Sequence, residues 1–175
     1  LLTRQPELWT PDNQNLSMQY INPCVILAGV AAGAVACLVM VLVLSLVFGF
    51  DRELTVSLLP KSVTTAIGVP LSELAGGMAP VTTAAIIFTG IIANILGPWL
   101  CKLFRLTDEV SRGVAFGTAG HVIGTAKANE LSSLTGAVSS LSLVVAGLLT
   151  AILLPLMASA QAQITIKKIK ISDFP

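Results

Sequence analysis

The chain has 175 residues, of which 54% are hydrophobic and 11% are charged, and its formal net charge is +1. Soluble domains carry roughly 25% charged residues, so this composition excludes a soluble globular domain. The abundance of apolar side chains also excludes intrinsic disorder. A net charge of +1 gives no electrostatic case for binding nucleic acid, which requires a clustered basic face. The composition therefore predicts a protein whose main partner is the lipid bilayer and that binds no nucleic acid.

Three stretches without a charged residue are long enough to cross a bilayer as helices, since roughly 20 residues at about 1.5 Å each span the hydrocarbon core. These stretches are residues 24–50, 81–101 and 137–158. We predict one membrane span in each of them. The predicted organisation is a polar N-terminal segment at residues 1–23, a transmembrane domain at 24–158 and a C-terminal tail at 159–175.

Two further segments, residues 54–72 and 113–130, have an intermediate composition. The first combines Pro60 and Lys61 with hydroxyl side chains, and the second carries four glycines, a histidine and a lysine. Neither is apolar enough to face lipid on all sides, and neither is polar enough for a long loop outside the membrane. Helices packed inside a protein bundle, broken at Pro60 and at the glycines, fit both segments. The predicted fold class is all-α, a polytopic membrane helix bundle with about five membrane segments and no sheet.

The chain also contains an internal repeat. Gly33, Gly90 and Gly147 are evenly spaced, because 90 − 33 = 57 and 147 − 90 = 57. The same offset pairs Asp51 with Asp108, Glu73 with Glu130, and Val81 with Val138. We interpret this pattern as a tandem repeat whose unit is a polar, glycine-bearing segment followed by an apolar helix. Paired interrupted segments in corresponding positions indicate the binding site of a transporter.

Basic residues predict the orientation in the membrane. Lys102, Arg105 and Arg112 follow the second apolar run, so this end is expected in the cytoplasm. If residues 113–130 cross the membrane, the last helix returns and the C-terminal tail with its lysines is also cytoplasmic. A re-entrant segment would place that tail outside, against the charge rule. We therefore expect residues 113–130 to cross.

The first polar segment has the chemistry of a small anion site. Pro60 cannot continue a helix from upstream but suits the first turn of a new one, so we expect a helix to restart there. Such a helix start presents free backbone N–H groups, to which Ser62, Thr64 and Thr65 add hydroxyls. Lys61, Thr64 and Thr65 would share one face of this helix. This arrangement predicts a seat for a carboxylate.

An alternative role for Lys61 is structural. A lysine at mid-membrane costs at least about 2.5 kcal/mol on insertion scales, so it has a partner or contacts water. Lys61 could pair with Glu73 or Glu130 instead of a ligand. These two glutamates occupy equivalent positions of the repeat, and we assign them to segment boundaries and not to an acid/base pair.

The second polar segment contains the chain's single histidine. Thr118, His121 and Thr125 fall on one face of a helix, and protonation of His121 could couple to ligand binding. The alternative is that His121 is only hydrogen-bonded to a neighbouring helix. Two small-xxx-small steps let another helix approach closely. These steps are formed by Gly113 with Gly117 and by Gly120 with Gly124.

The remaining polar residues are expected to have structural roles. Lys127 lies close enough to a boundary to reach the interface, and Asn94 is expected to join helices. Cys24, Cys37 and Cys101 lie in or next to apolar runs and are expected to behave as small buried hydrophobes, with no disulfide or metal site. Motifs of soluble enzymes are absent from the sequence. We therefore expect no enzyme activity, no cofactor and no metal.

Two long motifs carry a family resemblance. They are LPKSVTT at residues 59–65 and RGVAFGTAGHVIGTA at residues 112–126. Their order and the helices around them are similar to those of the LrgB/CidB family, which includes bacterial antiholin-like proteins and the plastid glycolate/glycerate translocator. The resemblance covers about residues 25–157, as the C-terminal part of the family's membrane domain. Gly120 and Lys127 depart from the serine and arginine that are common at these family positions.

The resemblance implies two functions of different classes. One is a carrier of small monocarboxylates such as glycolate, glycerate or pyruvate, with Lys61 and the hydroxyls holding the carboxylate. The other is an antiholin-like regulator of murein hydrolase export and autolysis, whose partner is a small holin-like membrane protein. We favour transport, because an interaction protein does not need a lysine, a histidine and several hydroxyls inside the membrane. The resemblance further implies a bacterial cytoplasmic membrane, with the plastid inner envelope as the alternative, and a homo-oligomer as a further association.

Overall fold

The computed structural model describes the backbone of residues 23–172 and the side chains as far as Ser159. Most of the expected N-terminal segment and the last three residues of the tail lie outside this part. Every regular element that the structure describes is an α-helix, which confirms the predicted all-α class for residues 23–172. The helices are α2 (Pro23–Phe48), α3 (Arg52–Leu58), α4 (Thr65–Leu74), α5 (Ala79–Leu103), α6 (Glu109–Leu131) and α7 (Ser133–Ser172).

Three helices match the expected membrane spans. By length and apolar composition, α2, α5 and the part of α7 from Ser133 to Ser159 can each cross a membrane. They correspond to the three uncharged stretches of the sequence. Of the five expected segments, only these three form long apolar helices in the described part of the chain. The helix α7 continues without interruption to Ser172, across the boundary expected at residue 158.

The two polar segments begin and end in the same register. The helix pair α3–α4 covers 52–74 and α6 covers 109–131, so both ends differ by 57 residues (109 − 52 and 131 − 74). Asp51 and Asp108 cap the first helix of each segment. Each carboxylate accepts a hydrogen bond of 2.8 Å from the backbone N–H three residues later. Such a cap satisfies one of the free N–H groups and fixes where the helix starts.

The first polar segment folds back on itself, and we call α3–α4 hairpin 1. Gly68 of α4 packs against the carbonyl of Pro60, to which a Cβ at Gly68 would lie 3.3 Å away. Further along α4, Ser72 lies beside Ser57, because the Thr82 hydroxyl donates to the Ser57 carbonyl (2.9 Å) and bonds the Ser72 hydroxyl (2.7 Å). Later residues of α4 therefore contact earlier residues of the first arm, so the two arms of hairpin 1 run in opposite directions.

The helix after Pro60 restarts later than expected. Residues 59–64 form tight turns, in which Lys61 N–H donates to Leu58 and Val63 N–H donates to Pro60. The helix α4 starts only at Thr65, with Thr64 as its N-cap residue in an extended conformation. The prediction of a helix starting at Pro60 is therefore wrong, and so is the shared helix face of Lys61, Thr64 and Thr65.

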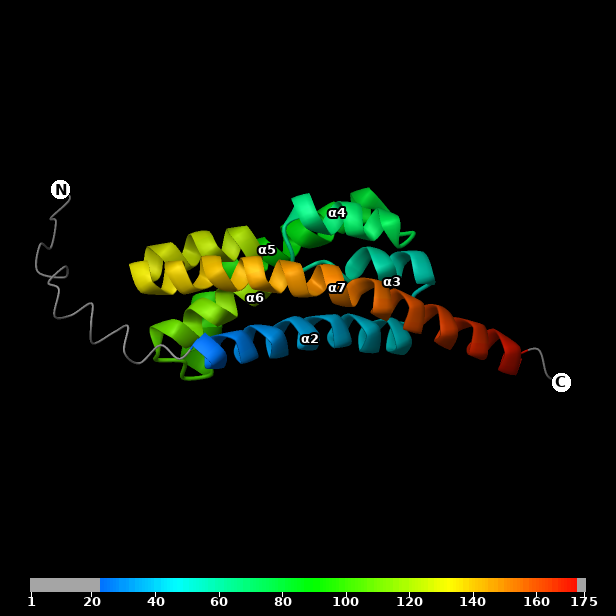
Figure 1. Cartoon of the computed structure of the whole chain (residues 1–175), viewed down its shortest axis with the longest axis horizontal. Helices are drawn as coiled ribbons and strands as arrows, with labels where there is room; N and C mark the ends of the chain where they lie inside the picture. Colours follow the sequence, from blue (N-terminus) through cyan, green and yellow to red (C-terminus); the bar gives the residue numbers. More distant parts are fainter. Residues whose placement is uncertain (1–22, 173–175) are drawn as a thin grey trace, which may run out of the picture.

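The second polar segment also folds back, and we call α6 hairpin 2. Its helical course is interrupted at His121, where φ is 42° and ψ is −138°. Eight residues apart in sequence, Gly124 and Phe116 are neighbours, since a Cβ on Gly124 would lie 2.9 Å from the Phe116 carbonyl oxygen. A straight helix would separate them by about 12 Å. The end of α6 and the start of α7 lie together at the left of Figure 1.

The two hairpins enter the bundle from opposite ends. Hairpin 1 opens where α2 ends and α5 begins, which we call the Asp51 end. Hairpin 2 opens where α5 ends and α7 begins, which we call the Lys102 end. The expectation that residues 113–130 cross is therefore wrong. The physical reason is the reversal at His121, which returns the chain to its starting side and sends α7 away from the Lys102 end.

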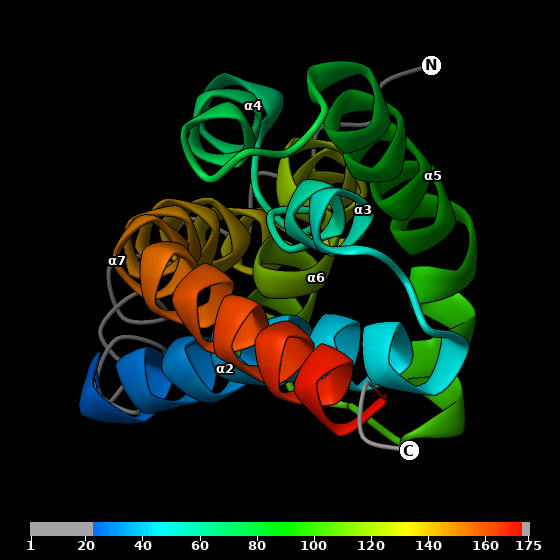
Figure 2. The same cartoon turned by 90° about the vertical axis from the view of Figure 1, so that its right-hand side faces the viewer.

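Small residues hold hairpin 2 against α7. A Cβ on Gly113 would lie 2.7 Å from the Thr135 carbonyl oxygen, and one on Gly117 would overlap the Ser139 carbonyl. The close helix approach expected from the small-xxx-small steps is thus present, and the first arm of hairpin 2 runs parallel to the start of α7. Figure 2 looks along the bundle and shows α3 and α6 between α2, α5 and α7, with α4 at the outer edge.

The core lies where α2 and α7 run side by side. Val30 packs with Ala146, and eight residues or about two turns further along each helix (38 − 30 and 154 − 146) Leu38 packs with Leu154. Leu59, close to the tip of hairpin 1, belongs to the second of these clusters. Packing of the long helices therefore positions the tip of hairpin 1 within the bundle.

Candidate functional site

A pocket of about 350 Å³ lies beside the tip of hairpin 1. Four parts of the chain contribute to it: α2 through Cys37, hairpin 1 through Lys61 and Ser62, α5, and the first arm of hairpin 2. The residues from the last two parts are Thr89, Ile92, Ala93, Gly97, Leu100, Cys101, Ala115, Phe116 and Ala119, with Phe104 and Leu106 after α5. Elements far apart in the sequence thus line one space.

Lys61 lies near the middle of the bundle. The other lining residues near its level are Cys37 and Ala93, which stand near the midpoints of α2 and α5. Every other charged side chain that the structure describes belongs to a segment at one of the two ends. Burying a cation at this depth is costly unless a partner or water compensates it. Lys61 therefore has the position expected of a functional residue in a membrane protein.

The structure contains no ion pair for Lys61 within residues 23–159. The ion pair that it does contain there joins Lys127 to Glu130 at 2.6 Å, close to the Lys102 end. Glu130 is thus engaged with a different lysine, and Glu73 is exposed at the Asp51 end. The alternative structural role for Lys61, pairing with one of these glutamates, has no counterpart in the described contacts.

Ser62 brings an unsatisfied hydroxyl to the same pocket. Its side chain is only 8% exposed, and its Oγ atom has no hydrogen-bond partner among the described residues. Buried polar atoms are nearly always hydrogen-bonded, because leaving one unpaired costs about 1–3 kcal/mol. A buried hydroxyl without a partner, next to a lysine without a counter-ion, is the arrangement that a ligand carboxylate would complete.

The two threonines expected beside Lys61 do not line this pocket. Thr64 is half-buried and makes no side-chain cap bond at the start of α4, and Thr65 is exposed. The structure therefore joins Lys61 and Ser62 but not Thr64 and Thr65. A role of the threonines in substrate binding stays a prediction.

His121 is engaged at the turn of hairpin 2. Its Nε2 lies 2.8 Å from the carbonyl oxygen of Ile86 in α5, and because a carbonyl only accepts, Nε2 must donate. The ring lies against Gly90, where any Cβ would overlap it. His121 is not among the residues that line the described pocket, so the expected joint cavity with Lys61 is not formed there.

Thr118 and Thr125 are also satisfied within the bundle. The Thr118 hydroxyl donates to the Val114 carbonyl at 2.7 Å, and its side chain packs on Gly33 of α2. Thr125 donates to the His121 carbonyl at 2.8 Å and bonds the Ser139 hydroxyl at 2.8 Å. These contacts connect hairpin 2 to α2 and α7, and a binding role for its polar face stays a prediction.

Comparison of the sequence with known proteins identifies the family of this chain. Residues 14–160 match the sequence model of the LrgB-like family. The chain belongs to the LrgB-like family. The motifs at residues 59–65 and 112–126, which contribute Lys61 and the reversal at His121, lie inside the matched range.

Relatives in the family carry a common description. The chain is 34% identical over 131 residues to the "Antiholin-like protein LrgB" of Bacillus mycoides (strain KBAB4), and the same values hold for the proteins of that name from Bacillus cereus (strain B4264) and Bacillus anthracis (strain CDC 684 / NRRL 3495). The match covers 75% of this chain and 57% of each relative, so the chain spans just over half of their length. No solved structure matches the chain. Family membership and three apolar helices together make this LrgB-like chain an integral membrane protein.

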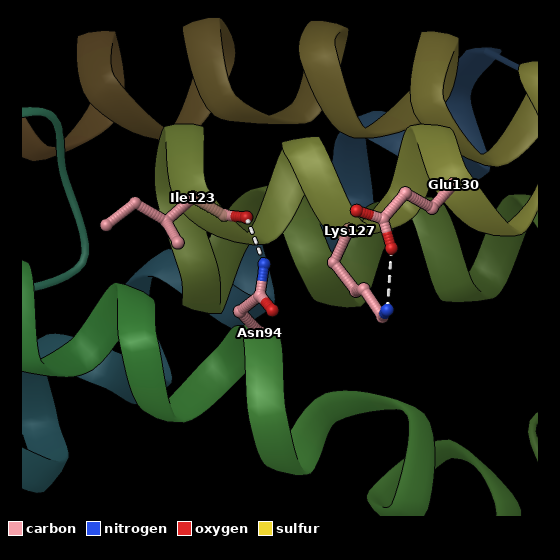
Figure 3. Close-up of polar contacts among 4 residues, drawn as sticks. All are labelled: Asn94, Ile123, Lys127 and Glu130. Carbon is pink, nitrogen blue, oxygen red and sulfur yellow. Dashed lines mark hydrogen bonds and ion pairs between the residues drawn. The ribbon is translucent and has the colours of Figure 1, made fainter.

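The LrgB-like chain has two polar contacts at residues for which structural roles were expected, and that of Asn94 is confirmed. Asn94 of α5 donates from Nδ2 to the Ile123 carbonyl of hairpin 2 at 3.2 Å, as Figure 3 shows. This bond joins two helices, as expected. In the same view Lys127 points to Glu130, near the end of hairpin 2, where the segment reaches its boundary.

Sequence reasoning missed the contribution of α5 to the site. Thr89, Ala93, Gly97 and Leu100 line the pocket as one stripe along the helix. The only signal is the spacing of small residues at three and four positions, which is also common in plain helix packing. The cysteines differ from expectation as well. Cys101 is buried and Cys37 half-buried, both at the pocket, whereas Cys24 is exposed.

Proposed function

We propose that this chain is part of a membrane carrier that translocates small organic acids of the glycolate, glycerate and pyruvate class. The observation that carries the proposal is the buried Ser62 hydroxyl without a partner beside Lys61, for which the described residues provide no ion pair. Lys61 supplies a positive charge and Ser62 supplies a hydroxyl donor, both at one pocket near the middle of the bundle. Charge-assisted hydrogen bonds to a carboxylate are the strong kind, and they gain further strength away from water.

The arrangement of the two hairpins supports the same proposal. We infer that residues 52–103 and 109–159 are two units of a tandem repeat with inverted topology. The supporting observations are the common 57-residue register, the paired aspartate caps and the entry of the hairpins from opposite ends. Inverted repeats with interrupted segments that meet near the bilayer midplane are typical of secondary transporters.

We further infer that both hairpins lie inside the membrane. Their backbones reverse direction within protein, where non-helical segments are tolerated because neighbouring helices surround them. Together with α2, α5 and α7 they make the five membrane segments expected from the sequence. The bacterial relatives favour a cytoplasmic membrane as the location, with the Lys102 end on the cytoplasmic side because of its basic residues.

A second candidate function rests on the description of the relatives. Their name, antiholin-like, favours a regulator that restrains a holin-like membrane partner through helix contacts. Such a role requires an apolar surface, and the long helices expose large side chains such as Val47, Phe88 and Val144. It does not require Lys61 or Ser62. Dependence of function on these two residues therefore separates the candidates.

Uptake by proteoliposomes tests the transport proposal. Vesicles containing the chain should accumulate labelled glycolate, glycerate or pyruvate, and Lys61→Ala should abolish this uptake without loss of folded protein. Lys61→Arg should not restore it, because a planar guanidinium does not fit the place of a compact ammonium. Lys127→Ala is the matched control, since this lysine pairs with Glu130 away from the pocket. Full uptake by well-folded Lys61→Ala would end the proposal.

A further inference from the structure

We infer that Thr89 of α5 selects acids that carry an oxygen on carbon 2, the carbon bonded to the carboxylate. Glycolate and glycerate have a hydroxyl on that carbon and pyruvate has a carbonyl, whereas acetate and propanoate have only hydrogen. The inference rests on the proposed function for the role of Lys61 and Ser62 as partners of the carboxylate. It adds the residue that distinguishes this class of acids from simple unsubstituted acids.

The pocket offers few hydrogen-bonding side chains to a ligand. Among its lining residues, Lys61, Ser62 and Thr89 carry a nitrogen or oxygen in the side chain. The other lining residues are aliphatic, aromatic, cysteine or glycine, and a cysteine thiol is only a weak donor. A second ligand oxygen would lose its bonds to water in this pocket unless it met a polar group. With the carboxylate on Lys61 and Ser62, that group is the Thr89 hydroxyl.

The hydroxyl of Thr89 is not engaged within the protein. Other threonines inside helices of this bundle donate to the carbonyl four residues earlier. Thr83 donates to Ala79 at 2.8 Å, and Thr118 donates to Val114 at 2.7 Å. Thr89 makes no hydrogen bond through its side chain within the described residues 23–159. Its half-buried hydroxyl is therefore available to a ligand in the pocket that it lines.

Thr89 lies one helical turn from the place where α5 meets the tip of hairpin 1. A Cβ on Gly68 would lie 3.3 Å from the Pro60 carbonyl oxygen and 2.8 Å from Cδ1 of Ile86, so these two residues flank one position of α4. Lys61 directly follows Pro60. Thr89 follows Ile86 by three residues (89 − 86), or about 4.5 Å along α5. Both residues are thus placed near one small acid, whose carboxylate and carbon-2 oxygen are on neighbouring carbons.

The chemistry of a threonine hydroxyl suits both kinds of carbon-2 oxygen. It can donate to the carbonyl of a 2-oxo acid, and it can donate to or accept from a 2-hydroxyl. An acid with only hydrogen on carbon 2 leaves Thr89 without a partner. Sites that bond a substrate oxygen discriminate against analogues that lack it for this reason. One neutral hydrogen bond changes affinity by up to about tenfold.

Equilibrium binding with the whole chain in nanodiscs tests the inference. Labelled glycolate is displaced by unlabelled glycolate, acetate, pyruvate, propanoate or 3-hydroxypropanoate. We expect glycolate to bind about tenfold more tightly than acetate, and pyruvate about tenfold more tightly than propanoate. 3-Hydroxypropanoate, whose hydroxyl is one carbon further away, should compete no better than propanoate. Equal competition within the two pairs by the wild-type chain would overturn the inference, and this comparison needs no variant.

Replacement of Thr89 assigns the selection to its hydroxyl. Thr89→Val keeps the shape of the side chain, so the preference for glycolate over acetate should fall to about twofold or less while acetate binding does not weaken. Thr89→Ser keeps the hydroxyl and should keep the preference. Thr83→Val is the matched control on the same helix outside the pocket, and it should leave both affinities unchanged.

Two results with folded Thr89→Val would contradict this role. An unchanged preference would mean that another group recognises the carbon-2 oxygen. An equal loss of affinity for glycolate and acetate would mean that Thr89 only supports the shape of the pocket.

Proteoliposome uptake separates this inference from the proposed function. If glycolate and acetate are taken up with equal apparent affinity in a Lys61-dependent way, the inference is wrong and the transport proposal stands. If glycolate binds with a preference that depends on Thr89 but no acid is taken up, the inference stands and the transport proposal fails. Absence of binding for every acid would overturn both.

Discussion

At the scale of single residues, Ser62 shows how a site can reduce stability. Its hydroxyl is buried without a partner, whereas the similarly buried Ser142 donates to the Val138 carbonyl at 2.7 Å. Both serines are buried in the same bundle, yet only one is satisfied. Under the proposed function, the ligand supplies the partner that the Ser62 hydroxyl lacks.

Ser62→Ala should therefore stabilise the empty protein. Removing the unpaired hydroxyl should raise the free energy of unfolding by about 1 kcal/mol, while ligand binding becomes weaker. Ser142→Ala is the control and should lower stability slightly, since it removes a satisfied hydrogen bond. Thermal unfolding in detergent, with and without glycolate, measures both effects. A loss of stability in Ser62→Ala would mean that the hydroxyl is paired in the native protein.

At the scale of elements, the sequence predicts the breaks in the two polar segments but not the direction that the chain takes after each break. Pro60 and the glycines predict that the helices are interrupted. They do not predict the path of the chain after the interruption, because a segment that crosses the membrane and one that folds back can have the same composition. The reversal depends on a positive φ at His121 and on the bond of its ring to a backbone carbonyl, and a backbone acceptor has no residue signature. The charge rule, applied to the basic residues near Lys102, therefore predicted a crossing segment where the structure has a reversal.

The site was predictable to a similar extent. Lys61 could be found because a charge in an apolar segment is unusual. Two features cannot be recognised without the structure: the absence of a hydrogen-bond partner for Ser62 and the row of α5 residues from Thr89 that lines the pocket. Hydroxyls and small residues also occur in ordinary helix packing, so their presence in the sequence does not indicate a site. The shared helix face of Lys61 and Thr65 failed because consecutive turns, and not a helix, follow Pro60.

Gly117 tests the packing of hairpin 2 on α7. A side chain there would overlap the Ser139 carbonyl and approach the Ser142 Cβ at 2.7 Å, and backbone cannot move away cheaply. Gly117→Ala should lower the free energy of unfolding by at least about 2 kcal/mol. In Gly147→Ala the new Cβ would meet the flexible end of Ile67 at 3.3 Å, so the change should stay within about 1 kcal/mol. Similar unfolding temperatures for both variants would contradict this packing.

At the scale of the whole molecule, the opposite entry of the hairpins fixes which loops share a side of the membrane. Thr107 precedes hairpin 2 and Ser133 follows it, and both lie at the Lys102 end. Glu73, at the end of hairpin 1, lies at the Asp51 end. All three side chains are exposed, and each can be replaced by cysteine after removal of the native thiols.

Labelling with a membrane-impermeant maleimide should distinguish the two topologies. Thr107→Cys and Ser133→Cys should react from the same side of sealed vesicles, and Glu73→Cys from the other side. A crossing segment would place Ser133 with Glu73. Reaction of Thr107 and Ser133 from opposite sides would therefore refute the reversal at His121.

The solitary charge of Lys61 has an electrical consequence for a carrier. An empty site holds one positive charge at mid-membrane, and a site occupied by a monocarboxylate holds none. Each elementary charge that moves through the full membrane potential changes in energy by about 2.3 kcal/mol per 100 mV. The return of the empty carrier would then be the voltage-sensitive step. Net uptake should respond to an imposed potassium diffusion potential, whereas exchange of acid for acid should not, and an equal response in both modes would show that Lys61 does not move through the electric field.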